Sequence, residues 1–256
     1  MGGSMSTAMM ASSIEREPEL LGQTVVVIGG SAGIGFETAR RARAEGAKVI
    51  LAARNPERLK HAATEIGALS TAAFDATDPV ALERFFRDLP AVDHVMVTAG
   101  RPYYGRLIEM DFTTVRDVLG QHLLQALYVA RNAINKVRQG GTLIFMGGTG
   151  ARRPAMGLSV TSAMTAAFPA LIASLALEIA PVRVNLIAAG FVDTPLSAEL
   201  LGDQLEKRRQ QLRTTLPIGR VVGPTDVAAL AVHIMTNTAL TGATYDIDGG
   251  QQFVAA

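Results

Sequence analysis

Short runs of hydrophobic residues alternate along the chain with longer segments of mixed or amphipathic character. The short runs are rich in β-branched residues and too short for helices, which is typical of strands buried on both faces of a sheet. We therefore expect strands at Thr24–Ile28, Lys48–Ala53, Thr71–Phe74, Asp93–Thr98, Thr142–Met146, Val182–Ile187 and Ala243–Ile247.

The longer segments carry apolar residues three and four positions apart, the spacing of a helix with one buried side. They predict helices at Ile34–Glu45, Pro56–Ile66, Pro79–Leu89, Phe112–Val137, Ala163–Ala180, Leu196–Leu216 and Thr225–Thr236. Strands and helices that alternate in this way predict an α/β fold. We expect a single-domain, Rossmann-like, doubly wound parallel sheet of about seven strands with helices on both faces.

A glycine-rich turn separates the first expected strand from the first expected helix. Glycines remove the Cβ atoms that would keep a pyrophosphate away from the backbone, and a helix N-terminus offers free N–H groups to phosphates. Strand, turn, helix and strand within about thirty residues predict a dinucleotide site. The expected cofactor contacts are Gly29, Ser31, Ala32, Gly33, Ile34 and Gly35.

The spacing G-x-x-x-G-x-G resembles the short-chain dehydrogenase/reductase family, whose first turn reads TGxxxGIG, although Ile28 replaces the usual threonine. The resemblance covers about Gly22 to Phe253 and includes the AGFVDTP segment that ends at Pro195. It implies that Asp75 and Ala76 lie at the adenine, and that Ala99 and Gly100 pass close to the cofactor. It further implies nicotinamide-side contacts from Gly190, Val192 and Thr194.

The end of the second expected strand distinguishes the two nicotinamide cofactors. A carboxylate there binds the ribose 2′-hydroxyl of NAD, whereas an arginine accommodates the 2′-phosphate of NADP. The chain has Ala53 and then Arg54, with no carboxylate before Glu57. NADP(H) is therefore favoured over NAD(H); the alternative is that Arg54 is a solvated surface charge.

Members of the family typically transfer hydride with an asparagine, a serine and a Tyr-x-x-x-Lys pair. The SLALE segment Ser174–Glu178 resembles the end of the family's active-site helix and sets the register. By that resemblance the four positions are occupied by His122, Gly148, Thr161 and Thr165. Threonine does not ionise near neutrality, and loss of a positioned acid or base typically costs about 10²–10⁴ in rate. The usual carbonyl-reduction mechanism is not supported.

Several residues are candidate substitutes for the missing groups. His122 titrates in the right range, and two tyrosines occupy the loop beside the same pocket. Thr149 is a candidate replacement for the serine by a one-residue shift. The candidate catalytic residues are His122, Thr149, Thr161, Tyr104 and Tyr103. Each residue also has a purely structural interpretation in place of a catalytic one, namely a packed histidine, tyrosines of a lid, or threonines of a helix.

Two basic clusters lie outside this set. Arg152 and Arg153 are candidates for holding an anionic substrate, with a solvated pair as the alternative. The Lys207-Arg208-Arg209 cluster is interpreted as the solvated side of a lid helix.

The chain keeps the residues expected to bind the cofactor but lacks the family's usual proton donor. Two functional hypotheses follow. The first is an NADP(H)-dependent oxidoreductase with a non-standard active site, acting on a small carbonyl, imine or enone compound. The second is a catalytically inactive NADPH-binding sensor or scaffold protein. Fold alone does not separate them.

Composition excludes several other classes of protein. The 256 residues carry 24 basic and 23 acidic side chains, so no basic surface for nucleic acid is indicated. The absence of cysteine excludes disulfides and thiolate chemistry, and no His/Asp/Glu cluster has the spacing of a metal site. No apolar run is expected to span a bilayer.

The sequence also carries expectations about the N-terminal residues and about how the chain assembles. Residues 1–20 are interpreted as a flexible arm without a signal peptide, in which residues 1–4 are a cloning remnant and Met5 is the natural start. Residues 21–256 are expected to form one dinucleotide-binding domain in a cytoplasmic protein. The resemblance implies a homodimer or homotetramer that pairs through Phe112–Val137 and Ala163–Ala180.

Overall fold

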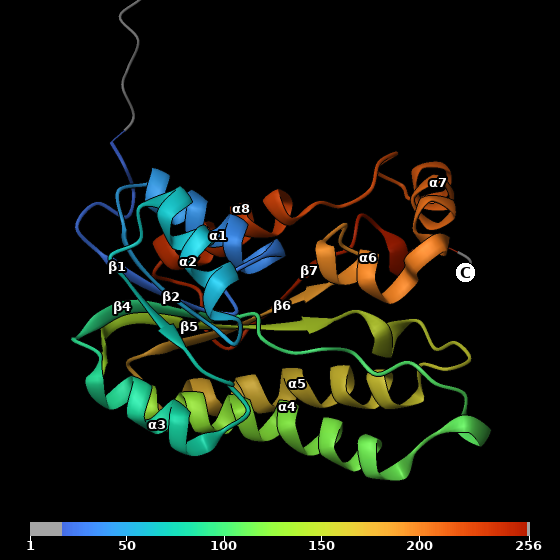
Figure 1. Ribbon diagram of the computed structural model, residues 1–256, viewed down its shortest axis with the longest axis horizontal. Coiled ribbons are helices and arrows are strands. Elements are labelled where there is room, and N and C mark those ends of the chain that lie inside the picture. Colours follow the sequence, from blue (N-terminus) through green and yellow to red (C-terminus); the bar gives the residue numbers. More distant parts are fainter. Residues whose placement is uncertain (1–16, 255–256) are drawn as a thin grey trace, which may run out of the picture.

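The computed structural model describes residues 17–254, which form a parallel seven-stranded sheet between two layers of helices (Figure 1). The strand order is β3-β2-β1-β4-β5-β6-β7, and every neighbouring pair is parallel. The expected doubly wound α/β fold is thus confirmed. The strands are β1 Thr24–Ile28, β2 Lys48–Ala53, β3 Ser70–Ala73, β4 Val92–Val97, β5 Val137–Gly148, β6 Arg183–Ala189 and β7 Thr244–Ile247.

Each face of the sheet has its own hydrophobic core. On one face β1 and β2 pack against α1, α2 and α8, and on the other face the sheet packs against α3, α4 and α5 (Figure 1). Strand residues alternate between the two cores, as the two-residue period of a strand requires. The helices are α1 Gly33–Ala44, α2 Pro56–Ile66, α3 Pro79–Asp88, α4 Phe112–Ala133, α5 Ser159–Glu178, α6 Pro195–Leu201, α7 Leu205–Thr215 and α8 Pro224–Thr236.

The boundary between α4 and β5 differs from the predicted one. The helix ends at Ala133 and the strand already begins at Val137, which is buried and pairs with Val92. The pairing then shifts register before His94, and this shift accommodates Gly140 at φ +79° inside the strand. An apolar residue at position 137 suits a helix and a strand equally, which is why the pattern placed the boundary too late.

The segment between β6 and α8 is also divided differently. A single helix over Leu196–Leu216 was expected, but α6 ends at Leu201 and is followed by Gly202, which has φ +49°. A short 3₁₀ turn, Gly202–Gln204, then leads into α7. These two helices stand at the end of the sheet to which the glycine turn also belongs (Figure 1).

Helix α5 corrects the expectation that no segment is long and apolar enough to cross a bilayer. By length and composition alone, Ser159–Glu178 meets that criterion, and it is the one such helix in residues 17–254. In the fold it packs against β6 and α4 and contributes Phe168, Ile172 and Leu175 to the core. Its apolar character therefore belongs to a helix that covers the sheet.

Leu20, which the sequence assigns to the N-terminal arm, is fully buried. Its N–H donates to the carbonyl of Glu45 at 2.9 Å, next to the end of α1. The folded part of the chain thus includes this residue. The proposed cloning remnant and the start at Met5 lie outside the described residues.

Candidate active site

The turn between β1 and α1 is folded so tightly that glycine is required. A Cβ atom on Gly29 would collide with Thr98, and one on Gly35 would collide with the carbonyl oxygen of Gly29. Gly29 also has φ +97°. Ala32, at the N-cap of α1, makes no side-chain cap and the first turn carries no acidic residue, so its N–H groups are available. This cradle fits the pyrophosphate of a dinucleotide.

Arg54 lies at the end of β2 with 68% of its side chain exposed. Its Nη1 is 3.8 Å from Oδ2 of Asp75, and within residues 17–254 it makes no closer polar contact. A cavity of about 370 Å³ extends between the glycine turn and α2. This cavity is lined by Ser31, Ala32, Gly33, Phe36, Arg58, His61, Ala62, Glu65 and Pro195.

Asp75 does not cap a helix; that role belongs to Asp78, whose Oδ1 accepts from Val80 N–H at 2.9 Å. Instead, Oδ1 of Asp75 accepts from the N–H and hydroxyl of Thr77 at 2.9 and 2.8 Å. Burial raises the pKa of Asp75, but the Thr77 bonds and the charge of Arg54 together lower it below its ordinary value. Asp75 is therefore an anion near neutrality.

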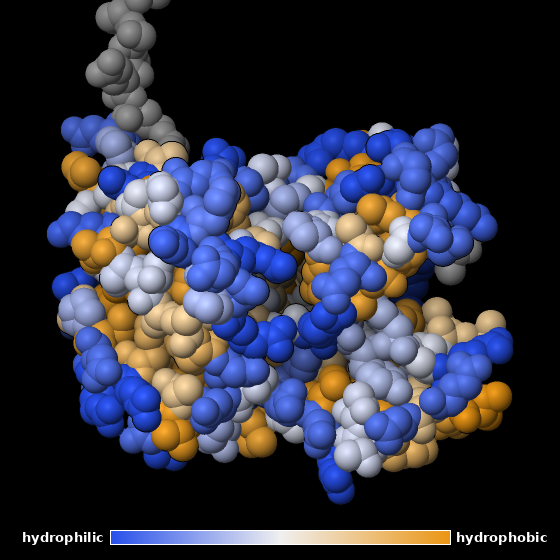
Figure 2. Space-filling model, viewed as in Figure 1, coloured by the Kyte–Doolittle hydropathy of each residue, from blue (hydrophilic) through white to orange (hydrophobic). Residues whose placement is uncertain are grey.

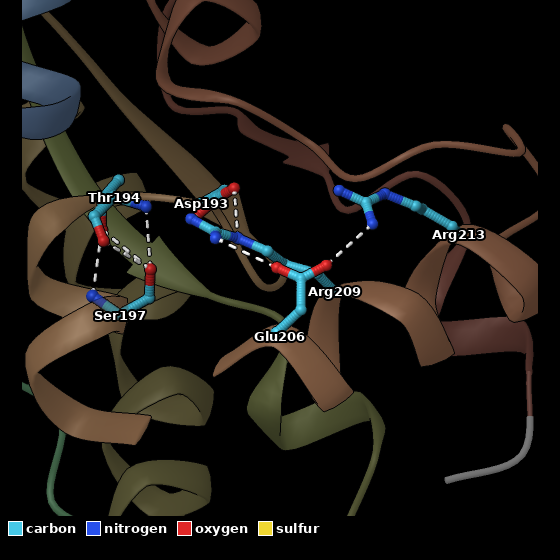
Figure 3. Close-up of polar contacts among 6 residues, drawn as sticks. All are labelled: Asp193, Thr194, Ser197, Glu206, Arg209 and Arg213. Carbon is cyan, nitrogen blue, oxygen red and sulfur yellow. Dashed lines mark hydrogen bonds and ion pairs between the residues drawn. The ribbon is translucent and has the colours of Figure 1, made fainter. Parts of the chain in front are cut away.

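The loop after β6 folds back over the glycine turn. Thr194 Cβ lies 3.4 Å from the position of a Cβ on Gly33, which is van der Waals contact. Thr194 also caps α6, since its Oγ1 accepts from Ser197 N–H at 3.2 Å while its own N–H donates to Ser197 Oγ at 2.8 Å (Figure 3). Val192 is buried and bridges to Val222. Thr194, expected on the nicotinamide side, thus lies beside the expected phosphate side, while Val192 is fixed by its bridge to Val222.

The lid formed by α6 and α7 is anchored to this loop by an ion pair. Arg209 donates to both carboxylate oxygens of Asp193, at 2.9 and 2.8 Å (Figure 3). Glu206 accepts from Arg209 at 3.3 Å and from Arg213 at 3.1 Å. The interpretation of residues 207–209 as a solvated cluster is therefore wrong for Arg208 and Arg209, which are both half-buried.

The residues at the family's serine, tyrosine and lysine positions come together in space. A Cβ on Gly148 would lie 3.3 Å from Thr165 Cγ2, and one on Gly150 would lie 3.5 Å from Thr161 Cγ2. Thr165 Oγ1 donates to the carbonyl of Thr161 at 2.9 Å. Thr161 Oγ1 donates to the carbonyl of Tyr103 at 2.5 Å. Both threonine hydroxyls therefore serve local structure.

Thr149 differs from those two threonines. It is 7% exposed, and its backbone N–H donates to the carbonyl of Ala189 at 3.0 Å. Within residues 17–254 its hydroxyl makes no hydrogen bond. Among the three threonines, Thr149 is the one that retains an available donor next to the former serine position.

His122 points from α4 toward the turn after β4. Its Nδ1 lies 3.1 Å from the carbonyl oxygen of Val118 and must donate to it, since a carbonyl only accepts. Its Nε2 lies 2.9 Å from the position of a Cβ on Gly100. Burial lowers the pKa of His122 and the Val118 bond partly offsets this. The ring is thus neutral near neutrality, with the Nε2 lone pair facing Gly100.

The two loop tyrosines are placed less favourably for proton transfer. The Tyr103 hydroxyl lies 3.2 Å from the position of a Cβ on Gly105, so the ring packs on its own loop. Tyr104 is 55% exposed, yet enough protein surrounds its phenol to raise the pKa, against the opposing charge of Arg208. The family's tyrosine requires a lowered pKa, so Tyr104 is not prepared for that role.

The profile of the family described as enoyl-(acyl carrier protein) reductase matches residues 29–252. The chain belongs to the short-chain dehydrogenase/reductase family. The family assignment made from the glycine turn is thereby confirmed, and with it membership of an oxidoreductase family.

Related proteins match over nearly the whole chain. A short-chain dehydrogenase/reductase of Stachybotrys chlorohalonatus, ATR9, is 29% identical and the match covers 91% of this chain and 98% of that protein. The oxidoreductase asL5 of Sarocladium schorii is 30% identical, with 93% and 98% covered. The solved structure of BdcA in complex with NADPH is 26% identical, with a TM-score of 0.81 and 91% and 95% covered.

Proposed function

We propose that this family member is an NADP(H)-dependent oxidoreductase with a non-standard active site, acting on a small carbonyl, imine or enone substrate. The observation that carries the proposal is the close approach of Thr194 to the glycine turn, with its Cβ 3.4 Å from where a Cβ on Gly33 would stand. A protein that bound only the adenine half of a dinucleotide would not need this loop closed over the turn. The position of this loop over the glycine turn supports binding of the whole dinucleotide, including its nicotinamide half.

NADP(H) is proposed over NAD(H) because Arg54, at the end of β2, is exposed and makes only a 3.8 Å contact with Asp75, which leaves its charge free for a 2′-phosphate. A 2′-phosphate would also replace the distant 3.8 Å contact of Arg54 with Asp75 by a closer, charge-assisted one. Asp75 and Ala76 are proposed at the adenine, and Ala99, Gly100 and Gly190 beside the rest of the cofactor. The BdcA structure, which contains NADPH, supports the same choice.

A nicotinamide cofactor supplies the hydride chemistry when bound, and the chain supplies orientation and the handling of the proton. We propose that the Thr149 hydroxyl donates to the substrate heteroatom, in place of the missing serine. His122 Nε2 is placed to accept a proton and is a poor acid at neutral pH. These residues suit substrates whose heteroatom can accept the Thr149 hydrogen bond, such as a carbonyl or a neutral imine, and whose proton comes from water.

The alternative, a catalytically inactive NADPH sensor or scaffold, is favoured by one specific observation. The Thr161 hydroxyl donates to the Tyr103 carbonyl, so the residue at the position of the family's acid anchors a loop. Titration with NADPH and NADH, followed by turnover tests on carbonyl, imine and enone panels, separates the two functions. Tight NADPH binding with no oxidation in any panel would support the sensor.

Cofactor preference has its own test in Arg54→Ala. We expect this variant to lose about tenfold or more in NADPH affinity, since a hydrogen bond to a charged group contributes roughly 1.5–3 kcal/mol. NADH affinity should change little. An equal loss for both cofactors would contradict the assignment. Loss of turnover in His122→Ala or Thr149→Val, with cofactor binding retained, would identify the group that handles the proton.

Assembly as a homodimer or homotetramer is also proposed, as is general in the family. Helices α4 and α5 leave Leu124, Leu127 and Leu177 exposed, at 47%, 42% and 82%. The exposed positions of α5 are otherwise mainly alanine, which lets two helices approach closely. Sedimentation equilibrium of the wild type and of Leu177→Glu tests the pairing, and a monomeric wild type would contradict it.

A further inference from the structure

The loop before α4 and the segment before α5 are joined beside the proposed active site. Gly105 N–H donates to the carbonyl of Gly157 at 3.0 Å. Two residues earlier in the loop, the carbonyl of Tyr103 accepts from the hydroxyl of Thr161, the residue at the position of the family's acid. These hydrogen bonds hold the two segments in a fixed relative position, so the space between them belongs to the fold.

A cavity of about 490 Å³ lies between these two segments. This volume is within the range of sites that bind small organic molecules. Much of its wall is apolar and is formed by Leu107, Ile108, Pro154, Ala155 and Met156. Among the described residues that line the cavity, Arg106 alone carries a charge. A pocket with mainly apolar walls and a single charged group is suited to a ligand of the same mixed character.

The apolar residues of this wall are strongly exposed to water. Ile108 and Met156, at 89% and 85%, are the two most exposed large hydrophobic side chains in residues 17–254, and Leu107 is 70% exposed. Figure 2 shows that the lobe carrying the start of α4, below α6 and α7 in the view, ends in a hydrophobic tip. An apolar ligand would remove this surface from water, which is favourable roughly in proportion to the area covered.

The charge of Arg106 is not balanced by a carboxylate within residues 17–254. Glu109, the nearest acidic residue in the sequence, forms no ion pair with it, and the guanidinium contacts the neutral sulfur of Met156 at 3.9 Å. Arg152, which the sequence singled out as a candidate for holding an anion, is by contrast already paired with Asp246. An anion that entered the cavity could therefore bind Arg106 without displacing a carboxylate, through charge-assisted hydrogen bonds.

We propose that this cavity binds a small molecule with an apolar body and one carboxylate. The body contacts Leu107, Ile108 and Met156, and the carboxylate accepts hydrogen bonds from Arg106. A carboxylate matches the single positive charge of the cavity, whereas a phosphate group would bring about two negative charges. The proposal concerns a ligand site and goes beyond the proposed function, so it stands whether or not NADPH is oxidised.

Isothermal titration of the full-length protein with octanoate, butyrate and octan-1-ol tests both halves of the proposal. Octanoate should bind about tenfold or more tightly than butyrate, because each methylene removed from water contributes about threefold. It should also bind about tenfold or more tightly than octan-1-ol, which lacks the charge. Arg106→Met should remove the preference for octanoate over octan-1-ol, and Ile108→Asn should reduce the preference over butyrate. Both side chains are exposed, so neither change should unfold the protein.

Arg116→Met is the matched control, because Arg116 is an exposed arginine on α4 that does not line the cavity. It should leave both preferences intact, and saturation with NADPH should change octanoate affinity little. Absence of octanoate binding, equal affinity for octanoate and octan-1-ol, or an equal loss in Arg116→Met would overturn the proposal. Loss of octanoate binding on addition of NADPH would also overturn it, by placing the carboxylate at the glycine turn. Failure of NADPH itself to bind would contradict the proposed function and leave the octanoate result standing.

Discussion

Arg209 on α7 donates two parallel hydrogen bonds to Asp193, the residue between the two proposed nicotinamide contacts Val192 and Thr194. The side chains are 30% and 29% exposed, so water screens the pair only in part. Helix α7 and the cofactor loop are thereby linked through a bidentate contact.

Breaking this contact should loosen the lid. In Arg209→Met we expect faster amide hydrogen exchange over residues 195–216, with little change in the midpoint of thermal unfolding. Arg213→Met is the control, since it removes only the more exposed contact with Glu206. Unchanged exchange in Arg209→Met would show that α7 is held by its apolar residues alone.

Buried His94 predicts a pH dependence of stability. Burial, and then the charge of Arg183, lower its pKa to about 4, and its Nε2 lies 2.6 Å from Oε1 of Gln23. The unfolded chain, with a pKa near 6.5, binds the proton more readily. Stability contributed by neutral His94 is therefore complete above about pH 6.5 and is lost as pH falls toward 4, by about 3 kcal/mol at most.

Urea denaturation between pH 4.5 and 7.5 measures this loss. The His94→Gln variant cannot titrate at this position, so its stability should fall less steeply over the same range. Equal slopes for the two proteins would assign the acid sensitivity to other groups.

Arg183 is 6% exposed and donates five hydrogen bonds to backbone carbonyls. The acceptors belong to Gly140, Ile234, Met235, Asn237 and Leu240, so one guanidinium closes the end of α8 and the turn after it. Arg183→Met should destabilise by about 3–5 kcal/mol, because it leaves buried carbonyls unsatisfied. Arg183→Lys keeps the positive charge but lacks the planar guanidinium, so it should recover only part of the stability that Arg183→Met loses.

Chemical denaturation gives these values directly. Arg131→Met, at an exposed site on α4, should change stability by no more than about 0.5 kcal/mol. A similarly small effect in Arg183→Met would mean that water replaces the guanidinium at low cost.

Gly100 and His122 should be energetically coupled. Gly100 has φ +154°, and a Cβ there would lie 2.9 Å from His122 Nε2. Gly100→Ala should therefore destabilise by about 1–3 kcal/mol through backbone strain and the clash. In the double variant with His122→Ala the clash disappears, so the two changes should be non-additive. Additive effects would show that the ring moves aside freely.

The sequence predicted the βαβ unit well because its signals are local and agree with one another. The buried strand, the glycines and the second strand each specify the same turn, and the structure places them as expected. The α4–β5 boundary was missed because Val137 fits either element. The division of the lid was missed because only its backbone shows that Gly202 ends a helix.

The site was predictable in position and less so in chemistry. The register from Ser174–Glu178 assigned Thr161 and Thr165, the resemblance assigned Gly148, and the three lie close together in the structure. Pairing between distant residues has no local signal, so the engagement of Thr161 with Tyr103 was not visible. The partial burial of Arg208 was not visible for the same reason: a run of three basic residues does not reveal which of them the fold shelters.

The hydrogen bond from Thr161 to the Tyr103 carbonyl has a consequence for attempts to restore the family's usual chemistry. A Thr161→Tyr, Thr165→Lys double variant would regain the acid and its lysine but would release the loop that frames the substrate entrance. The family's usual tyrosine at position 161 and the present anchoring of this loop are thus mutually exclusive. Recovery of an ordinary reductase from this chain would require a new anchor for the loop of residues 101–110, along with changes at His122, Gly148, Thr161 and Thr165.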